Sequence, residues 1–138
     1  MQHFEATNPA GPWTHVAMKQ SLHDLSVLFD DDGKVYVVWG YGDIRLAQLN
    51  DDLTDLVPGT RRTIIDNSAG LGGGLHFYKI GGQYFITSAW YRDRMRMVCA
   101  RAANRESPYE VSGAITADHA GPDPDRHDGS CFDWSFSL

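Results

Sequence analysis

The chain has 138 residues, of which 42% are hydrophobic and 22% charged, and its formal net charge is −6. This composition is typical of a single globular domain, and the negative charge with scattered Lys and Arg argues against a nucleic-acid partner, because phosphate binding requires clustered cations. No apolar run has the length of a membrane span, and the N-terminal residues lack the features of a secretory signal, so neither a membrane partner nor a signal peptide is expected and localisation is left open.

Two groups of short strands are expected in chain order, joined by turns rich in glycine and proline. The first group comprises residues 26–29, 35–39, 44–49 and 62–65, and the second comprises residues 75–80, 83–90, 94–100 and 110–115. Residues 30–33, Asp-Asp-Asp-Gly, are predicted to form a hairpin turn that faces solvent, since glycine readily adopts the positive φ of such a turn. Lys79 is expected in solvent at a strand end.

The two groups form an internal repeat. A shift of 49 residues places Gly33 on Gly82, Tyr36 on Phe85 and Asp24 on Gly73. Four strands per unit at such a period are typical of β-propeller blades, although an unrelated small β-sandwich is the alternative.

The predicted fold class is therefore all-β, an arc of about two and a half four-stranded propeller blades. The predicted units are the end of one blade at 1–20, whole blades at 21–68 and 69–116, and the start of a further blade or an irregular tail at 117–138. An arc does not close into a ring, so self-association through open blade faces is expected.

The segment from Ser21 to Tyr36 resembles the blade-opening motif of glycoside hydrolase family 43, usually His-Asp-Pro-Ser-hydrophobic-Phe-Phe-Asp-Asp-Asp-Gly. Residues 107–110, Ser-Pro-Tyr-Glu, are similar to the Gly-Pro-Tyr-Glu blade end of that family, and the resemblance runs from Ala6 to Ile115. It implies part of a five-bladed propeller acting on xylosides or arabinosides, so the implied partner is a xylo- or arabino-oligosaccharide and no cofactor is implied. Such enzymes invert the anomeric centre with two carboxyl groups about 6.5–9.5 Å apart. A third carboxylate modulates the pKa of the acid.

Only one of the family's three carboxylates has a matching acidic residue in this sequence. Asp24 matches the third, whose negative charge keeps the general acid protonated; the alternative is a turn residue bonded to local backbone. The family's general acid is the Glu of a Glu-Gly-x-His-hydrophobic-Tyr-Lys motif. Here residues 73–79 read Gly-Gly-Leu-His-Phe-Tyr-Lys, so Gly73 stands at the position of the acid and has no proton to give. The family's general base belongs to an earlier blade and is expected to be absent from this chain.

Further candidates for sugar binding are His76, Trp90 and Tyr91, because aromatic rings stack on sugars. For His76 the alternative is packing within the blade, and Trp39 is expected to fill space between blades. His127, in His-Asp-Gly-Ser, resembles a turn whose His approaches a metal ion or water in some family members; a surface turn is the alternative.

Two functions follow. The first is a family 43-like domain whose ancestral activity is hydrolysis of O-glycosidic bonds in xylan- or arabinan-type oligosaccharides, and which is expected to be inactive as this chain. The second is a non-catalytic carbohydrate-binding or assembly module.

Overall fold

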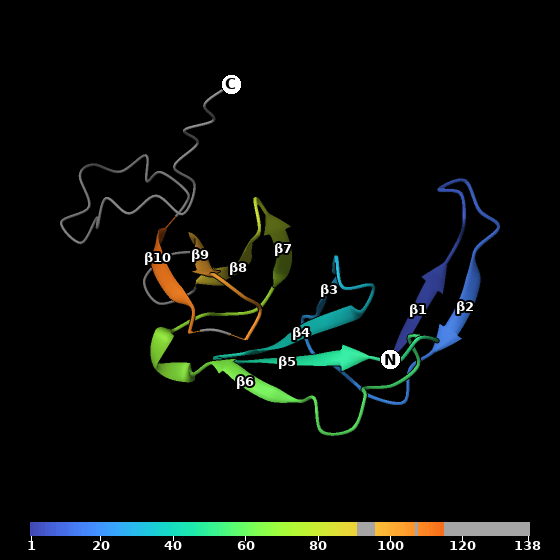
Figure 1. The fold of residues 1–138 in the computed structure, drawn as a ribbon, viewed down its shortest axis with the longest axis horizontal. Coiled ribbons are helices and arrows are strands. Elements are labelled where there is room, and N and C mark those ends of the chain that lie inside the picture. Colours follow the sequence, from blue (N-terminus) through green and yellow to red (C-terminus); the bar gives the residue numbers. More distant parts are fainter. Residues whose placement is uncertain (91–95, 107, 115–138) are drawn as a thin grey trace.

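A computed structural model describes residues 1–90, 96–106 and 108–114 of the chain (Figure 1). Within them lie ten strands and one single-turn 3-10 helix. The bounds are β1 (Gln2–Glu5), β2 (Thr14–Ala17), β3 (Ser26–Phe29), β4 (Val35–Tyr41), β5 (Asp43–Leu49), β6 (Arg62–Ile65), η1 (Asn67–Ala69), β7 (His76–Ile80), β8 (Gln83–Trp90), β9 (Arg96–Ala102) and β10 (Glu110–Ala114). The expectation of an all-β chain is confirmed.

The strands form a hairpin and two four-stranded antiparallel sheets. The N-terminal hairpin is β1–β2, the first sheet has the order β3-β4-β5-β6, and the second has the order β10-β9-β8-β7. Each sheet is a meander, because every strand pairs with its neighbour in sequence. The turn between β3 and β4 is closed by a hydrogen bond from Asp30 N to Lys34 O of 2.9 Å, and Gly33 takes the φ of 76° that this turn requires.

One hydrophobic core lies between the two sheets. Alternate side chains of each sheet point into it, as expected for strands with one face buried against a neighbour. Its buried members are Tyr36, Val38, Ile44, Leu46, Ile65, Leu71, Leu75, Phe77, Tyr84, Ile86, Val98 and Ala100. Since each fully buried aliphatic or aromatic side chain contributes about 1.5–3 kcal/mol, this shared core holds the sheets together.

The first strands of the two sheets, β3 and β7, are in contact. The backbone N–H of Phe77 in β7 donates a hydrogen bond of 3.0 Å to Ser26 Oγ in β3. Residues just before and just after these two strands are therefore brought together from distant parts of the sequence.

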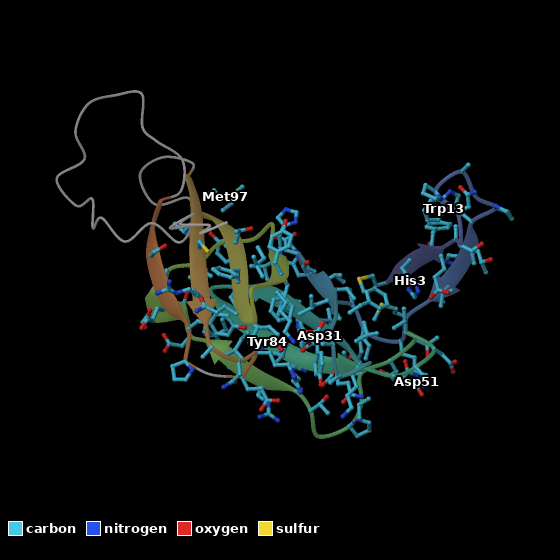
Figure 2. All side chains as sticks on the ribbon, turned by 45° about the horizontal axis from the view of Figure 1, so that its top comes forward. His3, Trp13, Asp31, Asp51, Tyr84 and Met97 are labelled. Carbon is cyan, nitrogen blue, oxygen red and sulfur yellow. The ribbon has the colours of Figure 1, made fainter. Side chains whose placement is uncertain are left out.

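The outer face of the first sheet is covered by the residues around the N-terminal hairpin. A second core there contains Val37 and Trp39 of β4, with Met1 and Met18 packed against it. The tip of the hairpin projects away from both sheets, and Trp13 on it is 57% exposed (Figures 1 and 2).

The outer face of the second sheet carries exposed hydrophobic side chains. Tyr78, Ile80 and Met97 are 44%, 40% and 42% exposed. Phe85 and Cys99 on the same face are buried, at 7% and 0% exposed, so only part of this face is exposed. The predicted self-association through open blade faces stays a prediction. Among the described residues, no helix is long and apolar enough to cross a membrane.

Candidate functional site

Asp24 lies in the segment that leads into β3, at the edge where the two sheets meet. Its φ of 51° is in the left-handed region, which is unusual for a residue other than glycine. The preceding residue is tied to the first sheet by a hydrogen bond of 3.0 Å from Gly40 N to His23 O. The Asp24 side chain is 38% exposed, and its Oδ2 lies 3.3 Å from His23 Nε2.

Gly73 lies in the equivalent segment that leads into β7, and it is buried. Gly72 N donates to Ala89 O at 2.8 Å, and Ala89 N donates to Gly73 O at 2.9 Å, so this segment is paired with the end of β8. The backbone of Gly73 is thereby held in place by hydrogen bonds to a neighbouring strand.

The structure brings Asp24 and Gly73 into direct contact. A Cβ atom added to Gly73 would lie 3.0 Å from Asp24 Cγ and would overlap Asp24 Oδ2. Real Cβ atoms do not approach other atoms that closely, so the Asp24 carboxylate occupies the space in which a side chain at position 73 would begin. At Gly74, by contrast, an added Cβ meets nothing within 4 Å.

The remaining sequence candidates are not all gathered at this contact. His76 is exposed at the start of β7, where its ring stacks on Tyr78 with centroids 6.2 Å apart. It lies on the face opposite to Phe77, which is buried in the core between the sheets. Trp90 ends β8, but its side chain, Tyr91 and His127 lie outside the described residues.

Trp39 fills space, as predicted: it is 5% exposed, on the outer face of the first sheet. The Arg61 guanidinium lies over its ring at 5.5 Å.

The sequence prediction missed a buried ionic cluster at the other end of β3. The Asp30 side chain is 1% exposed. It accepts hydrogen bonds from Lys79 Nζ at 2.6 Å, Tyr84 Oη at 2.7 Å and Arg105 Nη1 at 3.2 Å. The expectation that residues 30–32 face solvent is therefore wrong for Asp30, and the expectation for Lys79 is wrong too. The physical reason is that the second sheet and the β9–β10 connection cover the turn.

Protonation in this cluster follows from its contacts. Burial by itself raises the pKa of Asp30, but the hydrogen bonds from Lys79, Tyr84 and Asp31 N outweigh it and bring the pKa to about 2. The pKa of Lys79 is raised, chiefly by its hydrogen bond to Asp30. Both groups are thus charged over the whole physiological range.

Arg105 links this cluster to a second carboxylate. Its Nη2 lies 3.2 Å from Asp32 Oδ2, and its guanidinium stacks over the Tyr36 ring at 4.1 Å. Tyr36 Oη donates to Asp32 at 2.8 Å, and burial together with this hydrogen bond raises the pKa of Tyr36 to about 12. Figure 2 shows Asp31 and Tyr84 at this junction, far from Trp13 on the hairpin.

A cavity of about 140 Å³ adjoins the ionic cluster rather than Asp24. Tyr36, Arg62, Arg105 and Glu106 line it, and the sequence candidates for sugar binding do not. Its two arginines are already paired, since Arg62 Nη1 lies 2.6 Å from Glu106 Oε2 and Arg105 binds Asp30 and Asp32. Within the described ranges, no group of three or more His, Cys, Asp or Glu side chains could hold a metal ion.

The Asp24 site can accept hydrogen bonds and offers negative charge. The backbone at position 73 cannot release a proton, so the contact lacks a general acid there. Which role each candidate has stays a prediction.

Comparison with known proteins gives the same assignment from sequence and from structure. Residues 2–128 match the family described as Glycosyl hydrolases family 43. A curated relative, the "Non-reducing end alpha-L-arabinofuranosidase BoGH43B" of Bacteroides ovatus, is 35% identical over 78% of this chain and 21% of its own length.

Two solved structures share the arrangement of strands. A bifunctional GH43-CE protein of Bacteroides eggerthii has a TM-score of 0.74 and 28% identity, over 82% of this chain and 16% of that chain. A GH43B protein of a Bacteroides ovatus xyloglucan locus has a TM-score of 0.68 and 32% identity, over 80% of this chain and 23% of that chain. The chain spans about a fifth of these relatives. The likeness confirms the predicted fold class, an arc of propeller blades, over the β-sandwich alternative.

Proposed function

Since this chain belongs to glycoside hydrolase family 43, we propose that it carries part of a sugar site for xylose- or arabinose-containing oligosaccharides. In this proposal Asp24 is the carboxylate that in the family modulates the general acid, and position 73 is the place of an acid that is missing. The chain binds such oligosaccharides and does not hydrolyse them by itself, because inversion requires a protonated leaving group as well as an activated water.

The class of sugar comes from the relatives. The curated relative is named as an α-L-arabinofuranosidase acting at non-reducing ends, and one of the solved structures is described by its link to xyloglucan. Both names concern sugars that bear pentoses. We carry that class, but not a linkage, over to this chain.

One observation supports the loss of the acid most strongly. The Asp24 carboxylate fills the space next to Gly73, so no side chain at position 73 fits while Asp24 keeps its conformation. Without this contact, the space at position 73 could be thought to admit another acidic group. The contact indicates instead that the conformation of Asp24 is compatible only with glycine at position 73.

A second candidate is an assembly module that retains the blades without a sugar site. The exposed Tyr78, Ile80 and Met97 on the outer face of the second sheet favour it, because large apolar side chains left exposed are available for contact with a partner. This candidate predicts neither turnover nor saccharide binding.

The test combines an assay with a titration. The whole chain is incubated with nitrophenyl arabinofuranoside and nitrophenyl xyloside, and it is titrated calorimetrically with xylotriose and arabinotriose. We expect binding of at least one trisaccharide and no turnover above buffer. Turnover that disappears in Asp24→Asn would contradict the loss of activity, and absence of all binding would favour the assembly module.

A further inference from the structure

We infer that the cavity beside Arg105 binds an acidic sugar, a uronate, and that Lys34 and Arg62 hold its carboxylate. The identification of the ligand as a sugar rests on the proposed function, and its negative charge rests on the cavity itself. This is a second site, because the cavity adjoins the ionic cluster, at the other end of β3 from Asp24.

The cavity lies where the hydrophobic core between the sheets ends. Side chains two residues apart share one face of a strand. The core-facing row of β5 therefore continues from the buried Ile44 and Leu46 to Gln48, which lines the cavity. On the other side, Arg105 and Glu106 come from the β9–β10 connection of the second sheet. A polar wall thus replaces the next layer of the core.

The size of the cavity fits one sugar ring. Its volume is about 140 Å³. In another protein, a cavity of about 150 Å³ admits benzene, which is also a six-membered ring. A single uronate unit is therefore the ligand expected here.

The charges that line the cavity favour an anion. Lys34, Arg62 and Arg105 stand against one lining carboxylate, that of Glu106. This is a local reversal of sign in a chain whose net charge is −6. An ionised carboxylate only accepts hydrogen bonds, and its bonds to ammonium and guanidinium groups are charge-assisted. It therefore matches a wall made chiefly of donors.

Two of these donors are available to a ligand. The exposed Lys34 ammonium takes no part in the ion pairs formed among the described residues. Arg62 is paired with Glu106, but the two side chains are 47% and 42% exposed, and such surface pairs are weak. A ligand carboxylate can therefore replace Glu106 as the partner of Arg62.

Arg105 gives the cavity a fixed wall. Its terminal nitrogens each lie 3.2 Å from a carboxylate oxygen, one of Asp30 and one of Asp32, and its guanidinium stacks over the Tyr36 ring. Its third nitrogen, Nε, is buried and has no acceptor in the described part of the chain. Buried donors nearly always have one, so an anion beside this wall would stabilise the guanidinium.

A matched pair of ligands tests the site. Glucuronate and glucose differ by a carboxylate in place of a hydroxymethyl group. The whole chain is titrated with each at low ionic strength, because salt screens charges, and its amide NMR signals report both affinity and location. We expect glucuronate, and not glucose, to shift the signals of Lys34, Gln48 and Arg62. Equal shifts with glucose, or shifts with neither sugar, would overturn the inference, as would equally tight binding of inorganic phosphate, which would mark a general oxyanion site.

Substitutions at the rim test the two contacts. We expect the affinity for glucuronate to fall about tenfold in Lys34→Gln and in Arg62→Gln, since each removes one charge-assisted contact. Arg61→Gln is the matched control, because it removes the same charge one residue away, from a side chain over Trp39 on the outer face of the first sheet. Equal losses at positions 61 and 62 would mean a general attraction between charges and would overturn the assignment of Arg62.

A gain of affinity covers the case in which a loss reflects poor folding. Glu106→Gln removes the carboxylate that competes for Arg62, so the affinity for glucuronate should rise about threefold. Glu110→Gln is the control, because Glu110 pairs with Arg101 and does not line the cavity. No gain in Glu106→Gln over this control would overturn the role of Arg62.

The outcomes also separate this inference from the proposed function. If the chain binds xylotriose or arabinotriose but not glucuronate, this inference alone is overturned. If it binds glucuronate at Lys34 and Arg62 but neither trisaccharide, the proposed function fails and the carboxylate site stands.

Discussion

Asp24 and Asp30 flank the same short strand, β3, and both contact the second sheet, yet their surroundings are opposite. Asp30 has a side chain that is 1% exposed and accepts hydrogen bonds from three side chains. Asp24 has a side chain that is 38% exposed. It lies beside the His23 ring, and at position 73 it meets a glycine, which has no side chain to pair with it. The two ends of one strand thus contain a closed ionic site and an open one.

One junction between two blades therefore contains two carboxylates in opposite surroundings. Asp30 pairs with Lys79, which is 49 residues further on, and Asp24 contacts Gly73 at the same offset. Equivalent positions of consecutive blades are therefore neighbours along β3 and β7. A buried carboxylate enclosed by donors holds the blades together, whereas an exposed one with spare acceptor positions is free to bind a ligand.

The largest effect should come from opening the closed site. Asp30→Ala leaves the ammonium of Lys79 and the guanidinium of Arg105 without their shared acceptor. Breaking a buried ion pair from one side costs about 3–5 kcal/mol, and we expect the free energy of unfolding to fall by that amount. Urea denaturation followed by tryptophan fluorescence measures it.

The control for this loss is Asp31→Ala. Asp31 lies 3.0 Å from Lys79 Nζ, but its side chain is 85% exposed. An exposed ion pair contributes about 0–1 kcal/mol. Similar losses in the two variants would show that burial of Asp30 does not matter.

Lowering the pH should destabilise the fold through Asp30, the carboxylate of the closed site. The pKa of Asp30 is about 2 in the folded chain against an ordinary value of 3.8, so its ionised form stabilises the fold. This stabilisation is fully present above pH 4 and is lost as the pH falls toward 2, by about 2 kcal/mol in total. The measurement is the free energy of unfolding against pH. Asp32, Asp55 and Asp66, whose pKa values are also lowered, act in the same direction, so the contribution of Asp30 is the part that Asp30→Asn removes.

Removing one donor from the closed site should have a smaller effect. Tyr84→Phe keeps the ring, which is buried in the shared core, and deletes the hydroxyl that donates to Asp30 at 2.7 Å. Since Lys79 and Arg105 remain, we expect a loss of about 1–2 kcal/mol in the same denaturation experiment. A loss as large as that of Asp30→Ala would mean that the hydroxyl, and not the charge pair, holds the junction.

The fold was accessible from the sequence because its signals are local. Glycine-rich turns and alternating strands repeat, and each predicted strand is present in the structure within a few residues. The contact between Asp24 and Gly73 could also be predicted, since propeller blades radiate around an axis and bring equivalent positions of consecutive blades together. The roles of these two residues could not be predicted, because a role depends on a ligand that the sequence does not contain.

The closed site shows what local reasoning misses. Residues 30–33 do form the predicted turn between β3 and β4. Whether that turn meets solvent depends on Lys79 and Arg105, which come from the next sheet and its β9–β10 connection. The one available signal was the repeat, which places Asp30 on Lys79, a charge pair across two blades.

Substitutions at Asp24, the open site, should change the free energy of unfolding least. Asn adopts the left-handed conformation more readily than most residues, so Asp24→Asn keeps the backbone at its φ of 51° and removes only the charge. We expect a change within about 0.5 kcal/mol, as for other exposed substitutions. Asp24→Ala should cost about 1 kcal/mol, because alanine is strained there. Urea denaturation of both variants beside Asp30→Asn decides the matter. If Asp24→Asn destabilised the chain as much as Asp30→Asn, the carboxylate at Gly73 would be a second structural clamp between the blades, and the contrast between an open and a closed site would be lost.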